Sequence, residues 1–468
     1  MPVRIRPARA SLDSRASNGD ARPDNRLAFV DHALFAGDRA TGQKEVIQCV
    51  WVYEHAIDFD GLRRFHHNLG YGLLGRRIEC SPLPFARHRW VSDRGPSDID
   101  IAECARPRAE LSDWADERLQ LPTDPESGPG WHLGVLPLTD GSTAVSLVIS
   151  HHLIDGLGLV LTVADAVLGN TRDLGYPPPR SRTRLRAVVQ DARQTAQDAP
   201  EVARALIVAA KLACRRRHDI ARSRASRPVA LRGGDGDDAI VIPTITIRID
   251  LDDWDARATA LGGTSNTLAA GLAAKLGERM GRRRAGDGAV TVQLPISERT
   301  EGDTRANALS FARVIVDPTR VTTDLRDVRA AIFKQVLRSV RETPDESLQL
   351  LWLIPFTPKR ALKRLADGIA ADPDLPVFCS NLGDLGSVLC RLDGTDAEYA
   401  TARETRQHVT RQWLERTGGH MMLQSGRIGG KVGITVVAYQ PGAKNTKPAL
   451  RELAARTLAE FDLTGEID

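Results

Sequence analysis

An uninterrupted apolar run that leads into two adjacent histidines constrains the fold of this chain most. Residues 144–150 read AVSLVIS, and His151-His152-Leu153-Ile154-Asp155-Gly156 follow directly. A run of this length, rich in branched side chains, predicts a buried strand. Residues 157–168 are again mostly apolar and predict a helix that covers a core. The two histidines, the aspartate and the glycine therefore lie where a buried strand turns into a helix.

These residue types have chemical uses at such a turn. An imidazole has an ordinary pKa close to neutrality, so it can accept a proton at working pH. Asp155 requires a cation or hydrogen-bond donors, because an unpaired buried carboxylate is costly. Gly156 permits a positive φ or a close approach of the backbone. The simpler alternative is the polar end of a loop with two hydrogen-bonded histidines.

The string resembles the HHxxxDG signature of the acyl-CoA-dependent acyltransferase superfamily, with one residue fewer, since only Leu153 and Ile154 lie between the second histidine and Asp155. This group includes chloramphenicol acetyltransferase-like enzymes, nonribosomal peptide condensation domains, plant acyltransferases and bacterial wax ester synthase/diacylglycerol acyltransferases. The resemblance implies an α/β fold of two lobes, each a mixed sheet flanked by helices, with a tunnel between them. It also implies roles for the motif: His152 as general base, His151 as a mainly structural residue, Asp155 as a residue that shapes the loop, and Gly156 as a backbone donor near the oxyanion.

A candidate partner for Asp155 lies far along the chain. The segment 290–299, VTVQLPISER, is similar to the superfamily strand that ends in Pro-Val-x-x-Arg. In condensation domains the arginine at this place pairs with the motif aspartate, so we expect Arg299 to pair with Asp155. A buried carboxylate requires such a cation on physical grounds as well. An ordinary surface arginine is the alternative.

Two weaker matches supply candidates for the tunnel. Trp131 follows Pro129 and Gly130, where wax ester synthase-like enzymes have Pro-Leu-Trp; a turn followed by a core anchor is the favoured physical interpretation. Ser380 and Asn381 lie in SNLGDLG, where relatives have Ser-Asn-Val-Pro-Gly-Pro, and predict a loop that crosses between the lobes. An Asn-Asp pair of those enzymes is replaced by Asn266-Thr267. The loss of these residues weakens the case for lipid synthesis.

A chain of 468 residues is too long for one ordinary core, which favours two domains. We expect a disordered tail over 1–25, an N-terminal lobe with the motif over 26–175, a basic helical linker over 176–238 and a C-terminal lobe over 239–468. A solvated bridge between the lobes is the favoured interpretation of the linker. A surface for anionic lipid, for a phosphopantetheine carrier or for coenzyme A phosphates is the alternative.

Composition limits the classes of partner. The net charge of +4 is too small to indicate nucleic acid, and no apolar run has the length of a membrane span. Six cysteines without close pairing favour a reducing cytoplasm, and neither they nor the histidines have metal-ligand spacing. We therefore expect a cytoplasmic protein without a metal, in which the basic linker is a candidate for peripheral membrane contact.

The predicted activity is acyl transfer from a thioester to a hydroxyl or amine. Acyl-CoA or a phosphopantetheine thioester would be a co-substrate, with no tightly bound cofactor. The sequence has no Gly-x-Ser-x-Gly elbow and no cysteine nucleophile motif, which favours direct transfer without an acyl-enzyme. One alternative is a free-standing condensation enzyme that uses an acyl or peptidyl carrier protein and makes an ester or amide of a natural product. Another is a non-catalytic carrier-docking domain.

Overall fold

The computed structural model describes residues 24–220, 239–341 and 349–468. Its strands, in chain order, are β1 (Lys44–Tyr53), β2 (Arg76–Glu79), β3 (Arg89–Ser92), β4 (Asp100–Ile101), β5 (Trp131–Pro137), β6 (Thr143–Ser150), β7 (Thr244–Asp250), β8 (Val290–Ser297), β9 (Leu309–Val316), β10 (Val377–Asp384), β11 (Tyr399–Gln407), β12 (His420–Ile428), β13 (Lys431–Tyr439) and β14 (Glu466–Ile467).

The α-helices are α1 (Phe29–Thr41), α2 (Phe59–Leu69), α3 (Leu111–Gln120), α4 (Gly156–Leu168), α5 (Arg184–Ile220), α6 (Leu251–Ala260), α7 (Ser265–Arg279), α8 (Arg326–Arg341), α10 (Lys359–Ala370), α11 (Arg411–Thr417) and α12 (Lys447–Glu460). Short 3₁₀ helices are η1 (Gly72–Leu74), η2 (Arg108–Glu110), η3 (Leu350–Phe356) and η4 (Ser387–Cys390).

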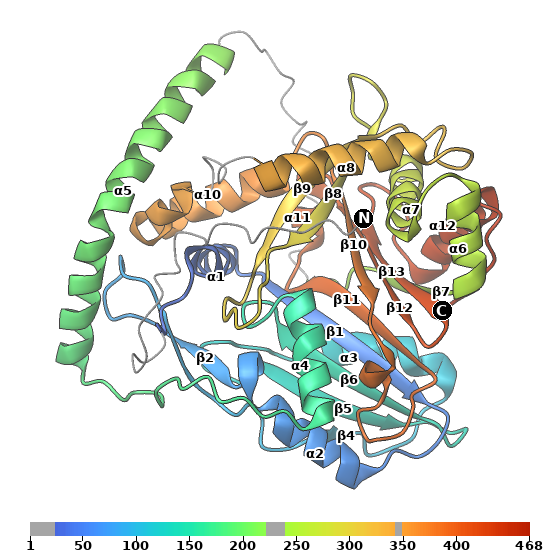
Figure 1. Ribbon diagram of the computed structural model, residues 1–468, viewed down its shortest axis with the longest axis horizontal. Coiled ribbons are helices and arrows are strands. Elements are labelled where there is room, and N and C mark those ends of the chain that lie inside the picture. Colours follow the sequence, from blue (N-terminus) through green and yellow to red (C-terminus); the bar gives the residue numbers. More distant parts are fainter. Residues whose placement is uncertain (1–23, 221–238, 342–348) are drawn as a thin grey trace, which may run out of the picture.

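Two large sheets organise the described chain (Figure 1). One has five strands in the order β11-β1-β6-β5-β4, and the other has seven in the order β14-β7-β13-β12-β10-β8-β9. Both are mixed, because β4 pairs parallel with β5 and β10 pairs parallel with β8 and β12, while the other pairs are antiparallel. Helices flank both sheets. The predicted α/β fold class, with two mixed sheets, is confirmed.

The histidine motif lies at the end of a completely buried strand. Every residue of β6 is buried, since the strand is central in its sheet and covered on both faces. Asp155 then caps α4: its Oδ1 accepts a hydrogen bond from the backbone N–H of Gly158 at 2.7 Å. The helix ends at Gly169, which has a φ of 75°. The predicted order of buried strand, motif and helix is therefore present.

A strand from the second half of the chain completes the five-stranded sheet. We call residues 24–220 the first half and the described residues from 239 onward the second half. β11 pairs antiparallel with β1 from Lys44 opposite Gln407 to Val52 opposite Tyr399. The segment just before it packs into the same core, where Trp51 Nε1 donates to the carbonyl oxygen of Leu389 at 2.7 Å. The predicted lobe boundaries did not include such a crossing strand, and they stay a prediction. The two halves of the chain share one sheet.

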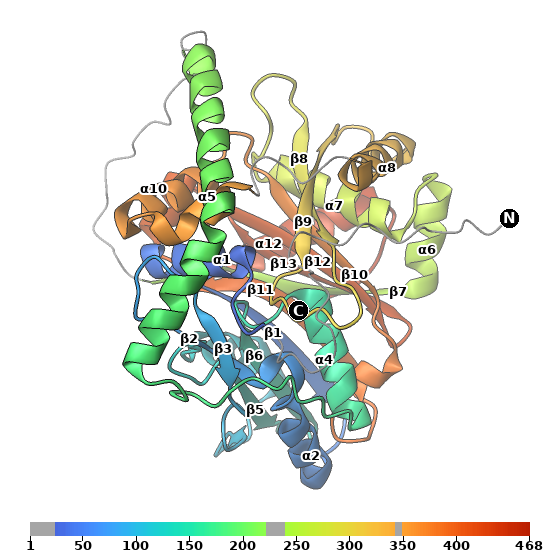
Figure 2. The same ribbon diagram turned by 60° about the vertical axis from the view of Figure 1, so that its left-hand side comes forward.

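The predicted basic linker contains α5, which extends along one edge of the molecule, away from both sheets (Figures 1 and 2). Asp191 ties the helix to the first half of the chain, because it accepts hydrogen bonds from Arg89 at 3.1 Å and from the Ser81 hydroxyl at 2.7 Å. Residues 221–238 of the linker and 1–23 of the predicted tail lie outside the described residues. Asn25, the last residue of the predicted tail, is hydrogen-bonded to the backbone of Trp90.

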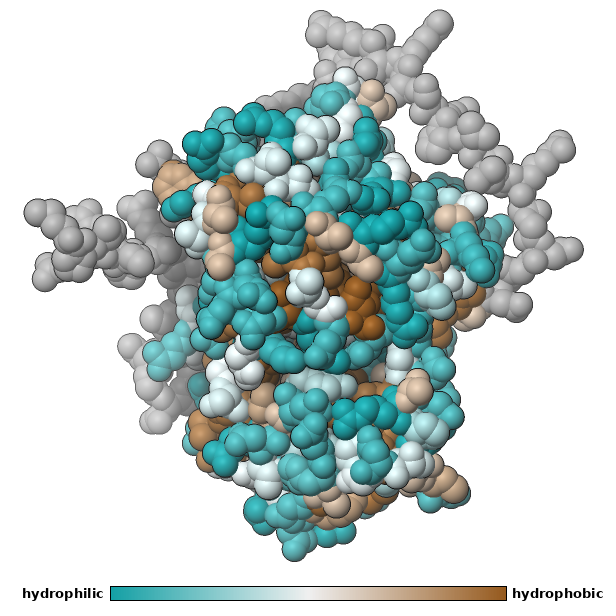
Figure 3. Space-filling model, turned by 90° about the vertical axis from the view of Figure 1, so that its right-hand side faces the viewer, coloured by the Kyte–Doolittle hydropathy of each residue, from teal (hydrophilic) through white to brown (hydrophobic). Residues whose placement is uncertain are grey.

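Across the three described ranges, no helix combines the length and the apolar character needed to cross a membrane. One face of the molecule is mostly hydrophilic, and hydrophobic residues gather in a hollow near its middle (Figure 3).

Gly61 gives a test of the contact between the two halves. A methyl group on Gly61 of α2 would lie 2.0 Å from the carbonyl oxygen of Asp393, which follows η4. We expect Gly61→Ala to lower the free energy of unfolding by about 1–3 kcal/mol, since the backbone must move apart. Gly37→Ala on α1 is the matched control, because nothing lies within 4 Å of its added methyl group. It should stabilise the protein by roughly 0.5–1 kcal/mol. Urea unfolding followed by circular dichroism measures both, and equal effects would contradict the contact.

Candidate active site

His152 is held by a carboxylate from the first helix. Its Nε2 lies 2.9 Å from Oδ2 of Asp38, and the imidazole is only 4% exposed. Asp38 is fixed in turn, since the same oxygen accepts a hydrogen bond from the backbone N–H of Glu45 at 3.0 Å. The ring of Phe35 meets the imidazole edge-on at a centroid distance of 5.6 Å. Nδ1 of His152 is buried and has no hydrogen-bond partner among the described residues.

His151 is placed as a cation. Its Nε2 lies 3.6 Å from Oε2 of Glu404 on β11, and its carbonyl oxygen accepts a hydrogen bond from the Asn307 side chain. Burial works against the charged imidazole, but the negative charges of Glu404 and Glu45 outweigh it and raise the pKa of His151 to about 10. A histidine that is already protonated at neutral pH cannot act as a base there. His151 is the histidine that three residues separate from Asp155, as in the HxxxDG part of the signature. Because His151 is engaged by Glu404, His152 is the candidate for proton abstraction.

Asp155 and Arg299 form a buried ion pair across 144 residues of sequence. The guanidinium binds both carboxylate oxygens, with Nη2 at 2.7 Å from Oδ2 and Nε at 3.2 Å from Oδ1. Each side chain is 3% exposed. Arg299 also donates to the carbonyl oxygens of Asp303, Arg305 and Ala306. Pairing and complete hydrogen bonding are what a buried charge pair requires.

The segment 299–308, which we call the latch loop, is also hydrogen-bonded to other residues of the first half of the chain. The backbone N–H groups of Ala306 and Asn307 donate to the buried carboxylate of Asp31 on α1, at 2.9 and 2.8 Å. The next N–H, of Ala308, donates to Asp155 at 2.8 Å. Arg76, which is 1% exposed, bonds the carbonyl oxygens of Thr304 in the latch loop and Leu153 in the motif. These bonds fix the motif relative to the second half.

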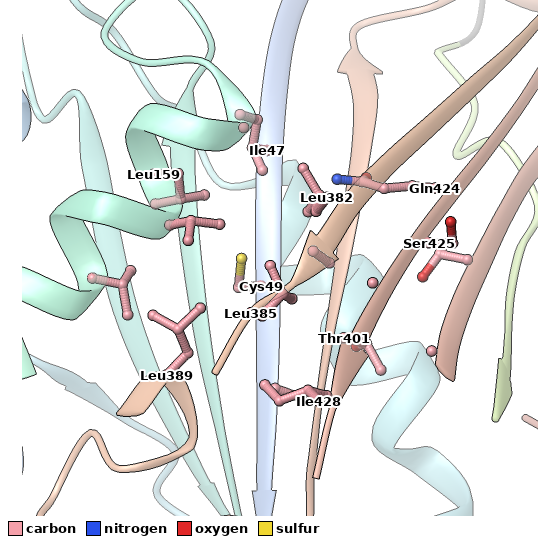
Figure 4. A pocket seen from close by; sticks show the side chains of 18 of the residues that line it. Ile47, Cys49, Leu159, Leu382, Leu385, Leu389, Thr401, Gln424, Ser425 and Ile428 are labelled. Carbon is pink, nitrogen blue, oxygen red and sulfur yellow. The ribbon is translucent and has the colours of Figure 1, made fainter. Parts of the chain in front are cut away.

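A cavity of about 70 Å³ lies next to the motif glycine, between the two halves (Figure 4). Leu159 of α4 lies on one side of β1 in this view, and Gln424 and Ser425 of β12 lie on the other. Gln424 presents a buried Oε1 that has no partner in the described chain. The lining residues are mostly apolar: Ile47, Cys49, Trp51, Gly156, Leu159, Val160, Val163, Leu382, Leu385, Leu389, Ala400, Thr401, Ala402, Gln424, Ser425, Gly426, Ile428, Gly433 and Thr435.

The structure does not bring the three predicted tunnel residues to this cavity. Trp131 is a core anchor: it is 1% exposed, and its Nε1 donates to the carbonyl oxygen of Leu74 at 3.2 Å. Asn381 instead bonds Asn266 at the start of α7, at 2.5 Å, and Ser380 offers its carbonyl oxygen to Ser425. Both lie on β10 rather than in a crossing loop. Two later residues, Leu382 and Leu385, line the cavity.

Asp38 is the site residue that the sequence interpretation missed. A signal for it is present in the spacing of Asp31, Phe35 and Asp38, since steps of four and three residues place side chains on one face of a helix. In the described ranges no cluster of histidine, cysteine and acidic side chains is suited to holding a metal ion.

Comparisons with known proteins show the fold. No protein-family model matches the chain, and no curated protein matches it in sequence. Among solved structures, the first condensation domain of the calcium-dependent antibiotic synthetase, in complex with a substrate analogue, is similar at a TM-score of 0.56 and 15% identity, over 94% of this chain and 99% of that one. The trichothecene 15-O-acetyltransferase from Fusarium sporotrichioides is similar at 0.55 and 11%, over 93% and 94%.

The wax ester synthase/diacylglycerol acyltransferase from Marinobacter aquaeolei VT8 is similar at 0.51 and 14% identity, over 93% of this chain and 98% of that one. The fold expected from the motif is therefore confirmed: the chain has the fold that condensation domains share with these acyltransferases. Identities of this size establish the fold and not the reaction, which has to be argued from the site.

The buried ion pair should dominate the stability of the junction. We expect Arg299→Met to lower the free energy of unfolding by about 3–5 kcal/mol, because it leaves Asp155 charged and buried. Adding Asp155→Asn, which keeps a side chain able to cap α4, should recover part of that loss. Arg63→Met is the control, since Arg63 pairs with Asp60 on the exposed surface of α2 and should matter little. Denaturant unfolding of the unaltered protein, the two single variants Arg299→Met and Asp155→Asn, and the double variant measures the coupling, and strictly additive losses would contradict it.

Proposed function

We propose that this chain is an acyltransferase that moves an acyl group from a thioester directly to a hydroxyl or amine. The observation that carries the proposal is the position of the motif at the end of a buried strand: its glycine, Gly156, lines a mostly apolar cavity that both halves of the chain form, and His152 lies four residues before it, buried behind the cavity wall and not among the lining residues. A concave, mostly apolar pocket with a few polar groups is typical of a binding site for a small molecule. The shared fold with acyltransferases supports the same class of reaction.

In the proposed reaction His152 removes the proton from the acceptor as its oxygen or nitrogen attacks the thioester carbonyl. The C–S bond breaks, and the thiolate takes up the proton from the imidazolium. Holding both reactants at one junction would supply much of the rate by orientation. The backbone N–H of Gly156, at the first turn of α4, is our candidate donor to the oxyanion. Asp155 and Arg299 shape the loop and carry no proton.

A covalent acyl-enzyme is the competing mechanism. Cys49 is the candidate nucleophile for it, because its thiol lines the cavity. Burial raises the pKa of Cys49 to about 12, so the side chain stays a thiol at neutral pH. The thiolate is the nucleophilic form of cysteine. Direct transfer is therefore the mechanism that we propose.

The donor would be acyl-CoA or an acyl group on the phosphopantetheine of a carrier protein. The cavity suits an apolar acyl part, and Gln424 would offer a hydrogen-bond acceptor within it. A free-standing condensation enzyme that joins a carrier-bound acyl group to an acceptor is the second candidate, favoured by the similarity to a complete condensation domain. Turnover of acyl-CoA, compared with that of the same acyl group on a carrier protein, separates the two. A non-catalytic docking domain would turn over neither.

Replacement of the base tests the proposal. We expect His152→Ala to lower kcat by about 10²–10⁴-fold, the usual contribution of a positioned general base. Thiol release from a panel of acyl thioesters, with mass spectrometry of the acylated product, measures it. His67→Ala is the control, because His67 lies exposed on α2. Activity of the His152 variant within a few-fold of the unaltered protein would refute the role.

A second variant tests the place of the acyl group. Val160 lines the cavity from α4, and the neighbouring Leu161 is 51% exposed and does not. We expect Val160→Phe to lower kcat/KM for long acyl donors roughly 10–100-fold relative to acetyl donors, since the added ring occupies the space of several methylene groups. Leu161→Phe should leave the ratio unchanged. An equal change for short and long donors would place the acyl chain elsewhere.

A further inference from the structure

The face of α1 that meets the motif carries two carboxylates with different tasks. Asp31 accepts two backbone N–H groups of the latch loop, and this anchors the helix. Asp38, two turns further on, reaches Nε2 of His152 at 2.9 Å. Phe35 lies between them in sequence and packs edge-on against the same imidazole. The helix is therefore positioned independently of His152 and brings Asp38 to it.

The chemistry of the two groups fixes where the proton lies. An ionised carboxylate only accepts hydrogen bonds, and a neutral imidazole has one N–H and one lone pair. A hydrogen bond between Asp38 and Nε2 consequently requires the proton on Nε2. The lone pair then belongs to Nδ1, the nitrogen that is buried without a partner in the described chain. The bond made at one ring nitrogen selects the tautomer at the other.

We propose that Asp38 is the positioning residue for His152, and that Nδ1 is the nitrogen that accepts the proton in acyl transfer. This inference rests on the proposed function. In the step, the acceptor O–H or N–H bond breaks and its proton moves to Nδ1, while the new C–O or C–N bond forms at the thioester carbonyl. Asp38 stabilises the imidazolium through Nε2–H. The C–S bond then breaks, and the proton on Nδ1 passes to the leaving sulfur.

The surroundings favour Asp38 for this task over the other acids nearby. Glu404 is engaged with His151, and Glu45 pairs with Arg406. Neither is within hydrogen-bond distance of His152. An acceptor that is buried without a partner is costly, and the cost is offset when a substrate N–H or O–H occupies it. Nδ1 of His152 is in that position.

The test reads the tautomer without any substrate. In protein labelled with ¹⁵N-histidine, long-range proton–nitrogen correlation spectra distinguish protonation at Nε2 from protonation at Nδ1, and His152→Gln identifies the signal. We expect the Nε2–H form in the unaltered protein. Asp38→Asn should give a mixture or the Nδ1–H form, because an amide can also donate. Asp38→Glu should restore the Nε2–H form at least in part.

Kinetics supply the second readout. Asp38→Asn should lower kcat for thioester transfer about 10–100-fold with a smaller change in KM, and Asp38→Glu should recover part of the loss. Asp60→Asn, an exposed aspartate on α2, is the matched control. An Nδ1–H tautomer in the unaltered protein, or an unchanged tautomer in Asp38→Asn, would overturn the inference. If the unaltered protein turns over no thioester, the proposed function is refuted. A tautomer that changes in Asp38→Asn would still establish the contact between Asp38 and His152.

Discussion

The buried pair of Asp155 and Arg299 is the interaction on which the geometry of the site depends. Removing two charges from water is expensive, and the cost is offset only where every polar atom finds a partner. Here the carboxylate also accepts from Gly158 and Ala308, and the guanidinium donates to three carbonyl oxygens of the latch loop. This set of bonds joins the motif turn to the latch loop. The end of β6, and with it His152, is consequently held against the second half of the chain.

Helix α1 extends the same arrangement to the imidazole. Its one polar face contacts the latch loop through Asp31 and His152 through Asp38, so a single rigid element connects the inter-half junction to the candidate base. α1 is covered on its other side by α10 and η3, where Ala40, Ile354 and Leu362 form a small apolar cluster.

Local signals in the sequence were enough for β6, the motif turn and α4, because an apolar run and a capping aspartate act over a few residues. The partner of Asp155 could also be inferred, since a buried carboxylate demands a cation and the resemblance indicated Arg299. β11 was not foreseen, because its buried positions are polar: Arg403 donates to Gln48 and Gln407 to the carbonyl oxygen of Leu119. Those partners lie more than 280 residues away in sequence, beyond the reach of any local pattern. The spacing of Asp31, Phe35 and Asp38 places Asp38 on one helix face, but nothing local indicates its partner, since His152 lies 114 residues away.

The crossing of β11 has a consequence for how the protein is made. β1 is an inner strand of its sheet only once residues 399–407 have been synthesised, and until then its long, largely apolar edge has unpaired N–H and C=O groups. During synthesis, the first sheet therefore stays incomplete until most of the second half of the chain has been made. Biogenesis, rather than the finished fold, is where this polypeptide is most exposed to pairing with the wrong strand.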